Sequence, residues 1–224
     1  MPRDADATRA RLLTAARDEF AAVGIAGARV DRIAAAAASN KAQIYHYFGS
    51  KDGLFDAVFD AMVAETLDEV TIDADDLPEY AGRLHDSYAR RPWVQRLATW
   101  YRLERGDAEQ PIDAVVRSNA AKLRAIEDAQ DAGRLPATFT AAELLGIVIH
   151  TAALWSGATP EYARLTDEVG AARRRAVVVA AVDAVVRAEA ARGVGVGGDV
   201  GDGVGGDVGD GVGGRSAHTR RNRA

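Results

Sequence analysis

The sequence predicts an all-α protein with a small N-terminal helical unit, a larger C-terminal helical bundle and a glycine-rich tail. Three observations support this prediction. Alanine is abundant, and no strand-like alternation of apolar and polar residues persists. Apolar residues recur at helical spacing, and glycine or proline falls between the periodic segments. A chain of 224 residues exceeds the usual size of one domain, so one or two domains are expected.

The N-terminal part is predicted to hold four helices. Apolar residues recur every three or four positions up to Gly24, which is expected to end the first helix. Residues 30–37 form a short second helix and residues 41–48 a third. Ser50 is placed to cap a fourth helix over residues 51–69.

Prolines divide the rest of the body, and each is compatible with the start of a further helix. These are Pro78, Pro92, Pro111, Pro136 and Pro160. Two long helices are expected at about residues 140–155 and 168–191. The count comes to roughly nine or ten helices.

The C-terminal tail has a composition of its own. From Gly193 to Gly214 the chain uses only glycine, valine and aspartate, and the octapeptide VGGDVGDG occurs twice. Glycine at this density makes ordering entropically costly, and isolated valines bury too little surface to offset that cost. Calcium-binding glycine–aspartate repeats are an alternative, but they follow a nonapeptide period. We therefore predict a disordered tail over residues 193–224.

The composition excludes several classes of function. The chain has no cysteine, which rules out disulfides, iron–sulfur clusters, cysteine-bound zinc and thiol nucleophiles. The net charge of −5 argues against a protein that coats nucleic acid, although residues 1–50 carry more basic than acidic side chains. Nothing near Met1 resembles a secretory signal, and the longest uncharged stretch, residues 144–160, suits a buried helix. We expect a cytoplasmic protein with no membrane partner.

Motifs of an enzyme are not found in the sequence. It has no GxSxG elbow, no HExxH motif and no phosphate-cradling glycine loop within the predicted fold. No cluster of histidine, aspartate and glutamate shows metal-ligand spacing. We therefore expect no catalysis, no cofactor and no metal.

Residues 29–55 are the most informative stretch. A short helix, a tight turn and another short helix match the size of a DNA-reading helix-turn-helix. On the second of these helices, Ile44 and Phe48 share one face that suits packing. The exposed side and its margins are then formed by Lys41, Ala42, Gln43, Tyr45 and His46. By pattern alone, a DNA-reading surface and a small helical bundle with packed aromatics are about equally supported.

The run IAAAAASNKAQIYHYFGSKDGLF, from Ile33 to Phe55, resembles the DNA-binding block of the tetracycline-repressor (TetR) family of bacterial transcriptional regulators. The resemblance is carried by Ile33-Ala34, Ala37, Ile44-Tyr45, Tyr47-Phe48, Ser50-Lys51 and Leu54-Phe55, preceded by Phe20-Ala21, Gly24 and Val30. The rest of the chain matches the family only in being helical and of suitable length.

This resemblance implies both a domain organisation and a function. Residues 1–51 would form a helix-turn-helix DNA-binding domain, residues 52–192 an effector-binding and dimerisation domain, and residues 193–224 the tail. The protein would be a homodimeric repressor that binds an inverted-repeat operator in double-stranded DNA and is released by a small-molecule effector. A ligand-independent regulator or an activator with the same DNA-binding domain is the alternative.

The turn departs from the family's usual Gly-Val-Ser, since it reads Ala38-Ser39-Asn40. Alanine fits there only if the backbone avoids a positive φ or tolerates strain, whereas Asn40 can cap the next helix as serine would. Arg29 stands where a capping threonine is common, so the cap is lost but a phosphate is within reach. Ala42 replaces a frequent glycine and keeps the groove-facing surface small.

The predicted DNA-binding set is Arg29, Asn40, Lys41, Ala42, Gln43, Tyr45, His46, Tyr47 and Lys51. Gln43 is expected to read a base edge, because its amide both donates and accepts. Tyr45 and Lys51 match phosphate contacts of the family, and Lys51 lies at a helix N-terminus that favours anions. Tyr47 is divided evenly between DNA contact and core, and Phe48 is assigned to the core.

The body holds most of the aromatic and histidine residues, which suits an aromatic-lined pocket for a small molecule. Filling of the helical core is the alternative for each of them. Trp100 and His150 are the predicted effector contacts. The last helix carries valines over an arc too wide for one buried side. Together with the resemblance, this arc leads us to expect that residues 140–191 form the homodimer interface, with Val182 inside it. Two ordinary core helices are the alternative.

Overall fold

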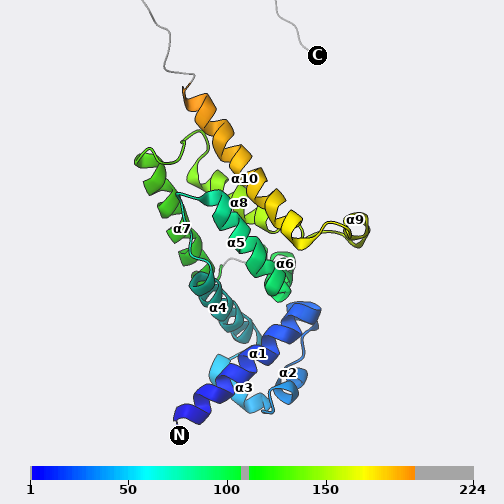
Figure 1. Cartoon of the computed structure of the whole chain (residues 1–224). Coiled ribbons are helices and arrows are strands. Elements are labelled where there is room, and N and C mark those ends of the chain that lie inside the picture. Colours follow the sequence, from blue (N-terminus) through cyan, green and yellow to red (C-terminus); the bar gives the residue numbers. More distant parts are fainter. Residues whose placement is uncertain (1, 107–110, 195–224) are drawn as a thin grey trace, which may run out of the picture.

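The computed structural model describes residues 2–106 and 111–194, and within these ranges all regular structure is helical (Figure 1). The helices are α1 (Pro2–Gly27), α2 (Val30–Ala36), α3 (Lys41–Phe48), α4 (Lys51–Glu69), α5 (Leu77–Arg90), α6 (Pro92–Arg105), α7 (Asp113–Asp131), α8 (Ala141–Ala152), α9 (Pro160–Leu165) and α10 (Ala171–Val194). The predicted all-α fold is confirmed. The predicted disorder of the tail lies outside the described residues from residue 195 onward.

Helices α1 to α3 and the first turns of α4 form a small N-terminal unit, which we call the head. Figure 1 shows it at one end of the molecule, with α4 running from it into the body. Its fully buried apolar residues are Leu12, Ala16, Phe20, Ile33, Ile44, Leu54 and Phe55. Helices as short as α2 and α3 are unstable in isolation, so this shared core holds them in place.

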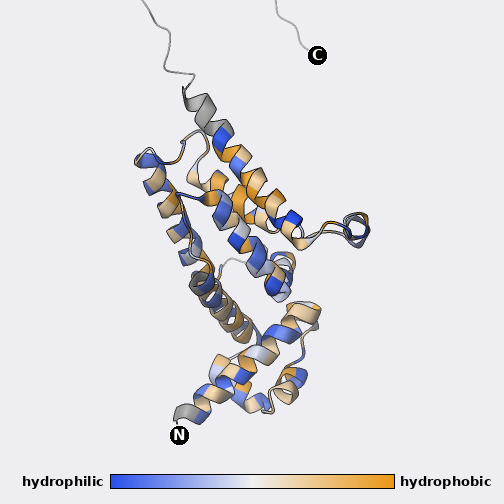
Figure 2. Cartoon of the chain, viewed as in Figure 1, coloured by the Kyte–Doolittle hydropathy of each residue, from blue (hydrophilic) through white to orange (hydrophobic). Residues whose placement is uncertain are grey.

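The body is built around α5, which packs against α6, α8 and α10, while α7 packs against α4 and α8. Buried residues of α5 recur at helical spacing and include Leu77, Tyr80, Leu84 and Tyr88. In Figure 2 the hydrophobic colour is concentrated on α8 and α10. The core of the body therefore centres on α5 and also includes buried residues of α4, α6, α7, α8 and α10.

Gly24 interrupts α1 where the sequence predicted that the first helix would end, and a second short helical segment follows it. Its φ of 76° lies in the left-handed region, and α1 continues to Gly27. A Cβ atom at Gly24 would lie 2.8 Å from the ring of Trp100 and also against the carboxylate of Glu104. Glycine is required both for the backbone conformation and for the close approach of α6.

Val178 and Val182 of α10 face the protomer's own core, which corrects the prediction for Val182. Val178 and Val182 are buried within a single chain, where α10 packs on α5 and α8. The wide apolar arc arises because α10 touches two helices of its own chain. Its outward side carries small exposed residues, namely Ala176, Ala180, Ala181 and Ala184.

Candidate nucleic-acid interface and internal cavity

The turn between α2 and α3 contains a strained alanine. Ala38 has a φ of 47°, which is the left-handed region that favours glycine. The N–H of Ser39 closes the turn by donating to the carbonyl of Ala34 at 2.9 Å. Of the two alternatives that the sequence left open for Ala38, strain is the one observed.

Asn40 caps α3 as predicted. Its side-chain oxygen accepts the backbone N–H of Gln43 at 3.0 Å, which satisfies one of the N–H groups left free at the start of a helix. The hydroxyl of Ser39 donates to Oε1 of Gln43. The amide oxygen of Gln43 therefore already accepts one hydrogen bond within the protein, and its NH₂ group remains available to donate.

The outer face of α3 carries Ala42, Tyr45 and His46, all of which are exposed. Tyr47 is half-buried against the core of the head, and its ring lies 5.3 Å from that of His46. Phe48 is also half-buried and packs on the core, as predicted, with the guanidinium of Arg9 over its ring. Tyr47 thus lies at the margin between the core and the outer face of α3.

Lys41 is engaged in an ion pair at the start of α3. Its Nζ lies 2.7 Å from Oδ1 of Asp31 on α2, and both side chains are exposed. The hydrogen bond with Asp31 raises the pKa of Lys41, so the ammonium is retained at neutral pH. Asp31 was not among the predicted site residues, because contact between successive helices cannot be read from spacing along one helix.

Two other predicted phosphate contacts occupy different positions. Nζ of Lys51 donates to the carbonyls of Ala28 at 3.3 Å and Ala26 at 3.5 Å, which links α4 to the chain after the α1 bend. Arg29 provides no side-chain cap for α2, as predicted, and its backbone N–H donates to Glu19 at 3.0 Å. Its side chain is left exposed at the edge of the head.

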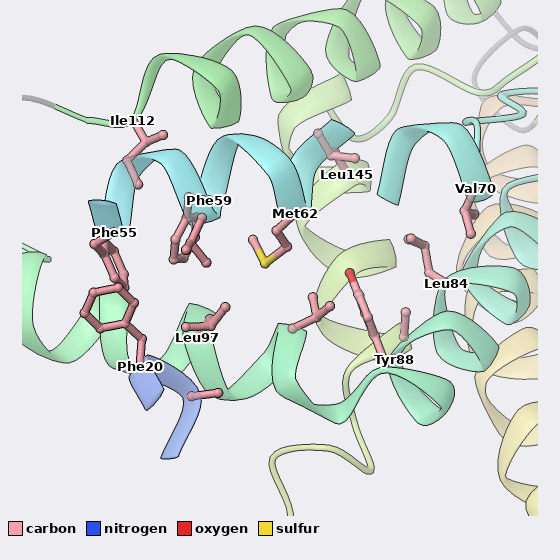
Figure 3. Packing of buried hydrophobic residues seen from close by; sticks show 14 of the residues in the cluster. Phe20, Phe55, Phe59, Met62, Val70, Leu84, Tyr88, Leu97, Ile112 and Leu145 are labelled. Atoms are coloured by element: carbon pink, nitrogen blue, oxygen red, sulfur yellow. The ribbon is translucent and has the colours of Figure 1, made fainter. Parts of the chain in front are cut away.

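A cavity of about 560 Å³ lies in the body. It is lined from α4, α5, α6, α7 and α8 by mostly apolar and aromatic residues, among them Phe59, Met62, Val63, Leu84, Tyr88, Val94, Tyr101, Val115 and Ile149. Figure 3 shows Phe59 and Met62 of α4 and Tyr88 of α5 pointing toward one another in this part of the body. A concave, mainly apolar site of this volume suits a small molecule.

The two predicted effector residues separate in the structure. His150 lines the cavity, and its Nδ1–H donates to the carbonyl of Gly146 at 2.8 Å. Because that carbonyl can only accept, the proton of this hydrogen bond is carried by Nδ1. Trp100 does not line the cavity but lies against Gly24, where α6 meets α1. A tryptophan at helical spacing looks the same in the sequence whether it lines a cavity or packs between two helices. The sequence therefore could not tell these two positions apart.

The end of α6 is tied to the head by charged groups. The guanidinium of Arg105 donates to Asp52 at 2.5 Å and to Asp56 at 2.6 Å, and it lies over the ring of Phe55. One residue earlier, the carboxylate of Glu104 accepts the backbone N–H of Ala26 at 2.8 Å. The same helix lines the cavity one to three turns further back.

Two kinds of feature are absent from the described residues. Within 2–106 and 111–194, no group of three or more histidine, aspartate and glutamate side chains is placed to hold a metal ion. In the same ranges, no helix combines the length and the apolar character needed to span a membrane.

A helix-turn-helix head on a helical body with a ligand-sized cavity defines a transcriptional regulator. Residues 12–58 match the family model for bacterial regulatory proteins of the tetR family, and residues 76–183 match the tetracyclin repressor-like C-terminal domain. The chain is 39% identical over 164 residues to the HTH-type transcriptional repressor SCO4008 of Streptomyces coelicolor, a match that spans 73% of this chain and 85% of that protein. This chain belongs to the TetR family of DNA-binding transcriptional regulators.

Other relatives agree with this assignment. The HTH-type transcriptional repressor NicS of Pseudomonas putida is 38% identical over 106 residues, which is 43% of this chain and 50% of that protein. The crystal structure of SCO4942 of Streptomyces coelicolor, assigned as a transcriptional regulator, superposes with a TM-score of 0.70 at 39% identity and covers 80% of this chain and 97% of that one. A TetR-family regulator from Rhodococcus, at 22% identity and a TM-score of 0.56, shares the fold, over 81% of this chain and 99% of that one.

Relief of the strain at Ala38 gives the first prediction. Ala38→Gly should stabilise the protein by about 1 kcal/mol, because glycine adopts a positive φ without the steric cost that alanine bears. In thermal melting this corresponds to a rise of about 2–4 °C for a protein of this size. The matched control is Ala35→Gly, an exposed helical position in α2, where glycine should destabilise by roughly 0.5–1 kcal/mol. Equal losses for both variants would contradict the strain at residue 38.

Proposed function

We propose that this protein is a homodimeric repressor that binds an inverted-repeat operator through α3 and releases it when a small molecule occupies the cavity. One observation carries the proposal: α4 and α6 both line the cavity and both hold the head. Met62 and Val63 of α4 face the cavity, while Asp52 and Asp56 nearer its start bind Arg105 of α6. A molecule that separates the two helices in the cavity would therefore also move the head.

The outer face of α3 supports a major-groove position. Its capped N-terminus, the small Ala42 and the exposed Tyr45 and His46 form a convex surface, and a helix of this kind fits the groove. Because the Gln43 amide oxygen already accepts from Ser39, the NH₂ group of Gln43 would act as the donor to DNA. Its NH₂ group then matches an acceptor on a base edge, such as O6 or N7 of guanine or O4 of thymine.

The test of DNA recognition compares Gln43→Ala with Lys51→Ala. Gln43→Ala should cost about 1–3 kcal/mol per half-site and relax the preference at one operator position, because a base contact is lost. Lys51→Ala should weaken binding to all sequences alike and lower the salt dependence by about one unit per half-site, because one phosphate contact is lost. Affinity is measured for an operator selected from random DNA and for its single-base variants at several salt concentrations.

The Lys51 variant needs a stability control, because Nζ of Lys51 also holds the carbonyls of Ala26 and Ala28. Melting temperatures measured beside the binding curves separate a loss of folded protein from a loss of phosphate contact. Unchanged base preferences in Gln43→Ala would show that other residues read the operator. If neither variant changed DNA affinity, α3 and the start of α4 would not be the DNA-binding surface.

Coupling between cavity and head is tested at Arg105. Compounds that raise the melting temperature and weaken operator binding are first identified by screening. Arg105→Gln should still bind such a compound, since Arg105 lies outside the cavity lining, but the weakening of operator binding should shrink. A switch of this kind has a coupling of roughly 1–3 kcal/mol, and the variant should lose a measurable part of it.

The matched control is Arg96→Gln, which removes an exposed guanidinium outside the cavity lining from the same helix. Equal coupling in both variants would mean that the head responds through α4 alone. Operator binding that no stabilising compound weakens would instead indicate a regulator that does not respond to ligand.

The outward side of α10 supports dimerisation through small residues. Ala181 is exposed, while its neighbour Val182 is buried in the protomer. Small side chains permit close approach of a helix from a second copy. Leu154, which follows the end of α8, is an exposed apolar residue that could add to this contact. The proposed interface therefore lies on the face of α10 opposite to its valine core.

Neighbouring substitutions in α10 separate the interface from the core. Ala181→Glu should convert dimers to monomers with little change in the far-ultraviolet spectrum, because it places a charge on the outward surface. Val182→Glu should instead unfold the body, because an unpaired charge in a dry core costs several kcal/mol. Light scattering and circular dichroism measure the two effects. A wild-type protein that is monomeric at micromolar concentration would exclude the dimer, and a dimeric Ala181→Glu would place the interface elsewhere.

A further inference from the structure

The wall of the cavity contains an ammonium group that has no acidic partner among the described residues. Lys122 of α7 is half-buried in the wall, and its Nζ donates to the hydroxyl of Ser118 at 2.6 Å. Burial lowers the pKa of Lys122, and no neighbouring charge of the described part of the chain offsets this. A buried cation without a counter-charge is unfavourable, so the site is suited to a charge that arrives from outside.

Two tyrosine hydroxyls in the same wall also lack partners among the described residues. Tyr80 is fully buried, and its hydroxyl oxygen has no hydrogen-bond partner in residues 2–106 and 111–194. The hydroxyl of Tyr88 makes no hydrogen bond with the described residues either, and burial raises the pKa of Tyr88 to about 12. Burial and the neighbouring Tyr88 raise the pKa of Tyr80 as well. Both phenols stay neutral, so each has a proton to donate.

The other charged side chain of the wall, that of Arg102, has the same sign as Lys122. Arg102 and His150 line the cavity, and none of its described lining residues is an aspartate or a glutamate. A cationic ligand would find no counter-charge there, whereas an anionic oxygen would find an ammonium and hydroxyl donors. The aromatic and aliphatic part of the wall provides the contact surface for an apolar group.

We propose that the cavity binds an amphipathic organic acid, with its carboxylate on Lys122, its apolar body against the rings and aliphatic side chains of α4 to α6, and an oxygen atom accepting from the tyrosine hydroxyls. The inference rests on the proposed function in that it names the chemical class of the effector. A charge-assisted hydrogen bond in a partly dry site is stronger than a neutral one, so the carboxylate dominates head-group selectivity. The cavity volume of about 560 Å³ leaves room for a medium-sized apolar body.

The experiment compares head groups on a constant apolar body. The probes are 4-phenylbutyrate, 4-phenylbutanamide and 4-phenylbutylamine, and in a second series decanoate, decanamide and decylamine. Calorimetry with the full-length protein should show that the acid binds at least about tenfold more tightly than the amide in one or both series, and that the amine binds most weakly. Absent or equal binding of acid and amide in both series overturns the inference, as does an amine that binds as tightly as the acid.

Substitutions assign the selectivity to individual groups. Lys122→Met should bring the affinities for acid and amide to within about twofold, because the charged donor is gone. Arg124→Gln, which removes an exposed charge from the same helix outside the cavity lining, should retain the preference. A preference that survives in Lys122→Met overturns the assignment of the carboxylate.

Tyr80→Phe tests whether the Tyr80 hydroxyl binds the ligand. The melting temperature without ligand distinguishes this role from a structural one, because loss of a structural hydroxyl would lower it. The variant should bind the acid about five- to tenfold more weakly, while its melting temperature without ligand stays equal or rises, because a buried unpaired hydroxyl is removed. A fall in melting temperature with unchanged acid affinity would show that the hydroxyl is structural.

These outcomes are distinct from those of the proposed function. Acid binding that leaves operator affinity unchanged would refute effector release and retain the acid site. If the protein shows no preference for acids but compounds without an anionic group release the operator, the acid site is refuted and effector release is retained.

Discussion

The contact between the end of α6 and the head determines how the DNA-reading surface is oriented on the body. The bend at Gly24 removes the regular hydrogen-bond partner of the Ala26 N–H, and the Glu104 carboxylate accepts that N–H instead. Because the bend also brings the Trp100 ring against Gly24, the direction of the second part of α1 depends on α6. Arg105 adds a link from α6 to the start of α4. Such partly exposed ion pairs contribute little to stability, about 0–1 kcal/mol each, but their geometry fixes the angle between head and body.

The sequence predicted the helices of the head well, because their limits depend on local chemistry. Asn40 and Ser50 cap the helices they were expected to cap, and α3 and α4 begin and end close to their predicted positions. Gly24 interrupts the first helix as predicted, and the second helical segment after it has a tertiary cause. A glycine at a positive φ ends a helix in isolation, but here the tertiary contact with α6 supports a second helical segment beyond it.

Contacts between helices were beyond the reach of the sequence. The pairing of Lys41 with Asp31, the Ser39 hydroxyl on Gln43 and the carbonyls held by Lys51 all join residues of different segments. Spacing along one helix assigns a residue to a face, but it does not say which element covers that face. The valines of α10 illustrate this limit, since two helices of the same chain produce the wide apolar arc that a dimer interface would also produce.

Several features of this chain are unfavourable for folding, and most of them lie where the proposed function needs them. An unpaired buried hydroxyl such as that of Tyr80 costs about 1–3 kcal/mol, and replacement by phenylalanine would remove that cost without changing the shape of the wall. Packing therefore does not explain the hydroxyl, and neither does the half-buried Lys122, whose place a methionine could fill. A bound ligand that pairs with the Tyr80 hydroxyl and the Lys122 ammonium would remove the cost of leaving them unpaired. The same groups thus lower the stability of the empty body and raise the affinity for a complementary ligand. In the proposed function, this difference in free energy would shift α4 and α6, and through Arg105 and Glu104 the head, toward a second arrangement.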